Sequence, residues 1–154
     1  MNYWLMKSEP DVFGIDDLAR AKNQTAPWDG VRNFQARNFL RYEMKAGDLA
    51  FFYHSSCEVP GIVGTMKIVR EGYPDKTQFD PNDEHYDPAS RPERPRWYVV
   101  DVKFEQKFDR IISLAELRTH ASGALKDMIV LKRGNRLSIT PVTKSEWDFI
   151  MSLL

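Results

Sequence analysis

Arg32 and Asn33 are the residues whose type and position most clearly suggest a binding role. The sequence predicts a helix from Gly30 to Met44, and at about 100° per residue both side chains project in nearly the same direction as its apolar residues. Polar side chains on a buried face need hydrogen-bond partners. One interpretation is that they point into a ligand pocket under the helix start, where free backbone N–H groups can also bind a ligand. The other, which spacing alone favours, is that they hydrogen-bond neighbouring loops and stabilise the fold.

Four aromatic residues stand at the ends of predicted elements, beside polar turns: Trp4, Trp28, Phe51 and Tyr53. One aromatic platform contributes about 1–3 kcal/mol to a stacked nucleic-acid base. For any single one of them, a place in the core is the simpler interpretation. Each nevertheless lies within a few residues of side chains that can hydrogen-bond the edge of a base, namely Lys7, Ser8 and Glu9, then Asp29, Arg32 and Asn33, then His54, Ser55 and Ser56. Together these residues predict a base-binding pocket.

Catalysis and metal binding are both disfavoured by the sequence. The segment from His54 to Cys57 offers a base and nucleophiles, but neighbours at a strand end point apart, and the chain has no G-x-S-x-G elbow. The acidic segment from Asp80 to Asp87 lacks the glycine and the terminal glutamate of a calcium loop. We therefore expect no enzyme activity, no catalytic residue, no metal and no cofactor.

Composition predicts a single domain over residues 1–154 and limits its partners. The chain has 154 residues, 22 Lys and Arg against 22 Asp and Glu, and one cysteine, Cys57. A net charge of zero means that any nucleic-acid contact must be local, because binders of long nucleic acid usually carry a basic excess. The single cysteine and the lack of a long apolar segment predict a cytoplasmic protein with no membrane contact, taken as a monomer by default.

The predicted elements alternate between strands and helices and indicate an α+β fold. Aromatic and apolar runs predict strands, and the alternation of apolar and polar residues over 97–108 predicts a half-buried strand. Capping patterns at Ser113 and Thr143 each predict the start of a helix. A polar, proline-containing stretch over residues 71–96 predicts a long surface excursion. The expected strands cover residues 3–6, 49–53, 61–69, 97–108, 128–131 and 137–139, and the expected helices cover residues 15–21 and 30–44 and the segments after the two caps.

Four segments together resemble the EVE-domain family in order and spacing. They are Tyr3 to Pro10 (YWLMKSEP), Trp28 to Asn38 (WDGVRNFQARN), Phe51 to Ser55 (FFYHS) and Arg136 to Ile139 (RLSI). The resemblance runs from the first strand to the last helix. It implies a PUA-like fold, a small curled β-barrel with flanking helices that is related to YTH and ASCH domains.

The same resemblance implies a reader of modified bases in DNA or RNA, with nucleic acid as the partner. Carried over residue by residue, it gives as ligand-binding residues Lys7, Ser8, Trp28, Arg32, Asn33, Tyr53, His54 and Ser55, with Arg136, Leu137 and Ser138 at the far wall. The hypothesis is that a base leaves its stack and lies between aromatic side chains while polar groups read its edge. Alternatives are a PUA-like RNA binder that ignores modification, a nucleotide-processing enzyme using the same pocket, and an interaction module without a ligand.

Overall fold

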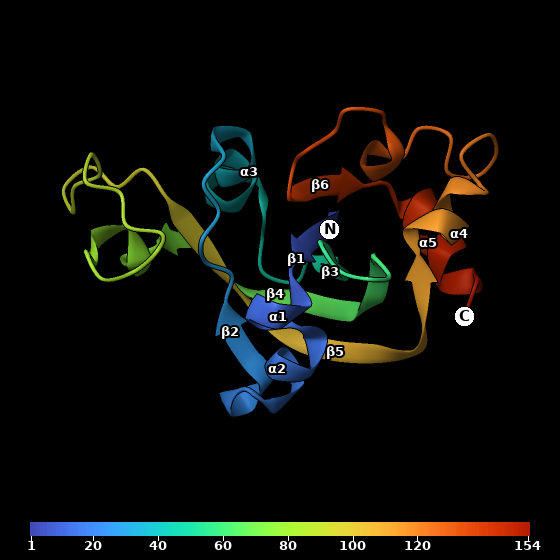
Figure 1. The fold of residues 1–154 in the computed structure, drawn as a ribbon, viewed down its shortest axis with the longest axis horizontal. Coiled ribbons are helices and arrows are strands. Elements are labelled where there is room, and N and C mark those ends of the chain that lie inside the picture. Colours follow the sequence, from blue (N-terminus) through green and yellow to red (C-terminus); the bar gives the residue numbers. More distant parts are fainter.

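The computed structural model describes residues 1–154 as one curled six-stranded sheet with short helices at its ends and faces (Figure 1). The strands are β1 (Tyr3–Ser8), β2 (Thr25–Pro27), β3 (Leu49–His54), β4 (Gly61–Pro74), β5 (Tyr98–Ser113) and β6 (Ile139–Val142), in the order β2-β5-β4-β3-β1-β6. β1 runs parallel to β3, and the other neighbours are antiparallel. The predicted α+β class with a curled sheet is confirmed.

Residues of the neighbouring strands β1 and β3 alternate between two hydrophobic cores, one on each side of the sheet. Successive side chains of a strand point to opposite faces, so Trp4 and Met6 of β1 enter one core while Leu5 enters the other. In β3, Phe52 joins the first core and Phe51 the second. Continuous apolar runs therefore suit strands that are covered on both faces.

The long strands β4 and β5 give the sheet its curl. Their pairing shifts register at four places, and each shift bends and twists the strands locally. Gly64 allows one close approach, because a Cβ there would lie 2.2 Å from the carbonyl oxygen of Gln106. Figure 1 shows β5 running along the molecule and bending toward the C-terminal helix, while residues 75–97 project from the opposite end of the sheet.

The helices are short and lie mainly near the strand ends. They are α1 (Pro10–Phe13), α2 (Ile15–Arg20), α3 (Phe34–Asn38), α4 (Leu114–Arg118) and α5 (Lys144–Ser152), with 3₁₀ turns η1 (Lys22–Gln24), η3 (Lys76–Phe79) and η4 (Ile129–Leu131) and the π-helical turn η2 (Phe39–Glu43). Thr143 caps α5 in a reciprocal box with Glu146, as the sequence predicts. No helix combines the length and the apolar character needed to cross a bilayer.

Several predicted boundaries are wrong. The helix expected over residues 30–44 begins only at Phe34, because Gly30 has φ +79° and Asn33 is an extended N-cap. Residues 71–74, expected in the surface excursion, continue β4, and β5 extends to Ser113. The strand expected over residues 128–131 is instead occupied by η4, and β6 begins at Ile139 rather than at residue 137.

Candidate functional site

A hollow of about 440 Å³ opens where β1 ends, between α1, β2 and the loop that precedes α3. The loop Trp28–Asn33 forms much of its wall, and His85 and Ser138 reach it from distant parts of the chain. We call this feature the hollow. Its size falls within the range of small-ligand sites in proteins.

One part of the hollow is apolar, with walls formed by Val12, Phe13, Ala26, Trp28 and Val31. Trp28 is only 5% exposed, and its ring meets those of Phe13 and Phe52 nearly edge-on, at centroid distances of 6.3 and 5.2 Å. It therefore contributes to the floor and offers little free face for stacking. Val12 is 65% exposed and lies at the rim. This wall can accept a small apolar group such as a ring methyl.

Arg32 fastens the loop Trp28–Asn33 to the excursion between β4 and β5. Its Nη1 donates to Asp75 Oδ2 at 3.0 Å, its Nη2 donates to Thr77 Oγ1 at 3.0 Å, and its Nε and Nη2 donate to the carbonyl of His85 at 3.1 and 2.8 Å. Both interpretations of Arg32 therefore hold in part, because it lines the hollow while its guanidinium is occupied in holding loops together.

Asp75 accepts several of the hydrogen bonds that join the two loops, and its side chain is only 1% exposed. Burial alone would raise the pKa of its carboxyl, but hydrogen bonds from Thr77, from the N–H of Gly30 and from Arg32 outweigh burial and lower that pKa. The carboxylate is thus charged and satisfied. It holds the walls of the hollow from a position 43 residues away from Arg32.

His85 lies directly against Gly30. A Cβ on Gly30 would come within 2.8 Å of the imidazole, so only glycine allows this contact, and its positive φ favours glycine as well. Asp83 Oδ1 accepts from the backbone N–H of His85 at 2.8 Å and lies 3.3 Å from its Nδ1. The sequence predicts no site role for His85, because the acidic stretch around it carries no periodicity that indicates a site.

Asp29, one of the polar neighbours of Trp28 that the sequence predicts for a base-binding pocket, also lines the hollow. Partial burial raises the pKa of its carboxyl, and the neighbouring charge of Asp75 raises it further. Its side chain forms no ion pair, and the one hydrogen bond that it receives comes from its own backbone N–H, so the carboxyl can still accept a hydrogen bond from a ligand. The polar neighbours of Trp28 in sequence were the available signal for it.

Residues at the ends of β1 and β3 mostly make structural contacts. Ser8 Oγ donates to the carbonyl of Phe13 at 2.7 Å, and the backbone N–H of Lys7 donates to the carbonyl of Ser138 at 2.8 Å. His54 Nε2 accepts from the N–H of Ile15 at 3.1 Å, and burial lowers the pKa of this imidazole. His54 therefore holds the start of α2.

The structure brings together five of the eleven predicted site residues around the hollow: Lys7, Ser8, Trp28, Arg32 and Ser138. The other six do not line it. Asn33 caps α3 by accepting from Ala36 N–H at 3.0 Å, Tyr53 is buried in the core on the other face of the sheet, and His54 and Ser55 lie at the end of β3. Arg136 and Leu137 precede Ser138 in the loop before β6.

A curled mixed sheet with short flanking helices places the chain in the PUA-like class of α+β domains. The chain belongs to the EVE-domain family, because the EVE domain model matches residues 2–153. Thymocyte nuclear protein 1 of Danio rerio is 53% identical over 97% of this chain and 71% of the relative, and that of Homo sapiens is 51% identical over 99% and 73%.

Solved structures of similar proteins share the fold closely. The crystal structure of human THYN1 protein in complex with 5-methylcytosine-containing DNA is 52% identical, covers 99% of this chain and 97% of that one, and has a TM-score of 0.94. Protein PSPTO5229 from Pseudomonas syringae is 46% identical, covers 98% of both chains and has a TM-score of 0.92. The family resemblance seen in the sequence is confirmed.

The cytoplasmic location expected from composition is wrong, because it disagrees with the names of these relatives. Proteins more than half identical to this chain are named as nuclear proteins. The expectation rested largely on the single cysteine, and thiols stay reduced in the nucleus as well as in the cytosol. Cysteine content therefore does not distinguish the two compartments.

Proposed function

We propose that the protein binds DNA and holds a modified base, 5-methylcytosine, in the hollow without transforming it. The observation that carries this proposal is a base-sized hollow that is lined both by an apolar wall and by polar side chains, among them Asp29. The complex of human THYN1 protein with 5-methylcytosine-containing DNA supports it, because that protein is 52% identical to this chain over nearly its whole length.

In this mechanism the base leaves the stack and enters the hollow, as in proteins that flip a base out of a duplex. The 5-methyl group contacts Val12 and Phe13 on the apolar wall. Burying one methyl contributes about 0.8 kcal/mol, so the methyl contact alone gives a modest preference. Most of the discrimination therefore comes from the polar edge of the base.

Asp29 is the group that reads this edge. A carboxylate accepts a hydrogen bond from the N4 amino group of cytosine, whereas thymine presents an acceptor at the same position. Ser8 and Ser138 line the hollow as further polar contacts, and Lys7 is half-buried beside them. Arg32, Asn33 and His54 support the surrounding backbone through the contacts described above. Tyr53, Ser55, Arg136 and Leu137 have no assigned contact with the base in this mechanism.

Fluorescence anisotropy with matched oligonucleotides tests this proposal. The panel places cytosine, 5-methylcytosine, 5-hydroxymethylcytosine, thymine or N6-methyladenine at one position, in single- and double-stranded DNA and in RNA. We expect the tightest binding to 5-methylcytosine in DNA. Thymine carries the same methyl, so its rejection isolates the contact with Asp29.

The matched variants are Asp29→Asn in the hollow and Asp109→Asn on an exposed part of β5. Asp29→Asn should reduce the preference for 5-methylcytosine over thymine by about 5- to 150-fold, the range that one good base-edge contact provides. Asp109→Asn should leave it unchanged. Equal binding across the panel would refute the base pocket, and a uniform preference for RNA would favour a modification-blind RNA binder.

A further inference from the structure

The loop Lys132–Ser138, between η4 and β6, carries a concentrated positive charge. We call it the basic loop. Lys132, Arg133 and Arg136 are exposed, and none of them forms an ion pair or a side-chain hydrogen bond. No acidic residue occurs between Asp127 and Glu146. In a chain whose total charge is zero, this is the kind of local basic surface that nucleic-acid binding requires.

The basic loop is attached to the hollow at its C-terminal end. Ser138 lines the hollow, and its carbonyl accepts from Lys7 N–H at 2.8 Å. Arg136 is two residues earlier, so its Cα lies within about 7 Å of that of Ser138. Figure 1 shows the segment before β6 arching above the sheet and returning to the start of that strand. Among the cations of the loop, Arg136 is therefore the nearest to the hollow along the chain, and Lys132 and Arg133 precede it in the same segment.

The other side of the hollow has the opposite charge. A second hollow of about 410 Å³ adjoins the first and shares Ser8, Val12, Gly30 and His85 with it. Its remaining walls are Glu9 and Glu84. Carboxylates repel a phosphodiester chain, so a strand whose base occupies the first hollow is directed away from these residues and toward the basic loop.

The internal structure of the basic loop also leaves a donor free. Gly134 has φ +78°, and Asn135 Oδ1 accepts from Leu137 N–H at 3.3 Å. Asn135 Nδ2 is buried and has no hydrogen-bond partner. A buried donor is normally satisfied, and a small displacement of this glycine-containing loop would present the amide to a phosphate oxygen.

We propose that the basic loop binds the DNA phosphates that flank the base in the hollow, through Lys132, Arg133 and Arg136. This proposal rests on the proposed function, in which DNA is the partner. The basic loop acts through its charge and does not distinguish one base from another. Phosphate contacts fix the position of a strand and do not read its sequence. The loop therefore supplies affinity, and the hollow supplies the choice of base.

The salt dependence of binding measures this contribution. Each neutralised phosphate adds about −0.7 for single strands and −0.9 for duplex DNA to the slope of log K against log salt concentration. Three contacts give a slope of about −2 to −3, which is a loss of about 20- to 40-fold in affinity between 50 and 200 mM salt.

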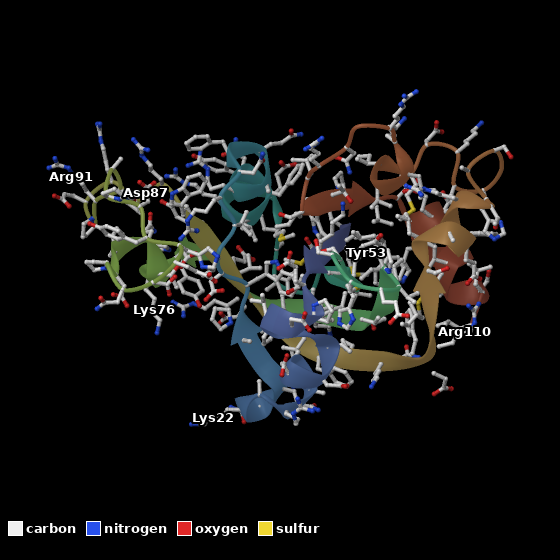
Figure 2. All side chains as sticks on the ribbon, in the orientation of Figure 1. Lys22, Tyr53, Lys76, Asp87, Arg91 and Arg110 are labelled. Atoms are coloured by element: carbon white, nitrogen blue, oxygen red, sulfur yellow. The ribbon has the colours of Figure 1, made fainter.

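The experiment measures the salt dependence of binding to methylated and unmethylated oligonucleotides for the unaltered protein and for three variants. The first replaces Lys132, Arg133 and Arg136 by Ala. The second, Arg133→Lys with Arg136→Lys, keeps the charge of the loop. The third removes the same charge elsewhere, by Lys22→Ala, Lys76→Ala and Lys103→Ala. In Figure 2, Lys22 lies at the lower edge of the molecule, and Lys76 lies on the lower side of its left-hand part.

We expect the first variant to flatten the salt slope by about 2 to 3 and to weaken binding equally for methylated and unmethylated DNA. The second and third should keep the slope of the unaltered protein. An unchanged slope in the first variant, or an equal loss in the third, would overturn the proposal. Thermal melting confirms that each variant is folded.

The two proposals fail differently. If the unaltered protein shows no preference among bases but only the first variant loses its salt slope, the basic loop stands and the base pocket is refuted. If the preference for 5-methylcytosine persists and the slope does not depend on the loop, the pocket stands and the phosphates are held elsewhere.

Discussion

Trp28 and Trp147 lie on opposite faces of the sheet and are buried to almost the same degree, 5% and 7% exposed. Trp147 belongs to the capped helix α5 and stacks nearly parallel on Phe51 at a centroid distance of 3.9 Å. Trp28 lies in a loop, meets its aromatic neighbours edge-on and borders the hollow.

The two tryptophans show that equal burial can be maintained by different forces. On the α5 side, Trp147 is held by ring stacking and by helix packing, and both bury apolar surface. On the hollow side, a network of hydrogen bonds between Arg32, Asp75 and Gly30 holds the loop. Hydrogen bonds fix a backbone without filling the space beside it, which leaves room for a ligand.

We expect the largest effect from Trp147→Ala, which tests whether the two faces of the sheet act independently. Removing a stacked, buried tryptophan should lower the free energy of unfolding by about 3–5 kcal/mol. The protein that remains folded should bind DNA as before, because Trp147 does not line the hollow. Urea denaturation and anisotropy measure the two quantities. Loss of base preference in the folded fraction would contradict the separation of the two faces.

Asp75→Asn should have the next largest effect. It keeps the volume of the side chain and removes the charge that accepts from Arg32, Gly30 and Thr77. Hydrogen bonds to a charged group contribute about 1.5–3 kcal/mol, and we expect a loss of stability in that range together with weaker binding of 5-methylcytosine. The control is Asp80→Asn, an exposed carboxyl of the same excursion. Unchanged binding by Asp75→Asn would show that the loop Trp28–Asn33 keeps its shape without the charged hydrogen bonds to Asp75.

Thr143→Ala is expected to affect only the α5 side. It removes the hydroxyl that accepts from Glu146 N–H at 3.1 Å, and loss of such a cap lowers stability by about 1 kcal/mol. Thr143→Ser retains the hydroxyl and should be nearly neutral. Both variants should leave the base preference intact. A change in that preference would mean that the two faces are coupled.

The smallest effect concerns pH and the hollow side. Burial lowers the pKa of His54, whose Nε2 must be unprotonated to accept from Ile15 N–H. The unfolded chain binds this proton near pH 6.5, before the folded protein does. The contribution is therefore complete above about pH 6.5 and is lost as the pH falls toward the lower folded pKa.

His54→Gln removes this titration. The drop in unfolding free energy between about pH 7.5 and pH 5 should be smaller in the variant than in the unaltered protein. Identical pH profiles would show that protonation of His54 does not affect stability. Polar contacts would then contribute less to the hollow side than the comparison with the α5 side implies.

Local patterns in the sequence predicted the strands β1, β3, β4 and β5 and the last helix. Continuous apolar and aromatic runs over residues 3–6 and 49–53 indicate strands, and the Thr143 and Glu146 pair marks the start of α5. Four short segments were enough to identify the EVE-domain family. These features were predictable because periodicity, capping and motifs are properties of neighbouring residues.

The arrangement of the site depends on contacts between segments that are far apart in the sequence. Trp28 is part of the floor and not an open stacking face, and the walls depend on Asp75 and His85, which follow Gly30 by 45 and 55 residues. No local pattern marks either residue, because their role comes from the folding of the 75–97 excursion against the Trp28–Asn33 loop. Contacts between distant segments are fixed by packing and hydrogen bonding across the whole chain, and a linear pattern does not record them.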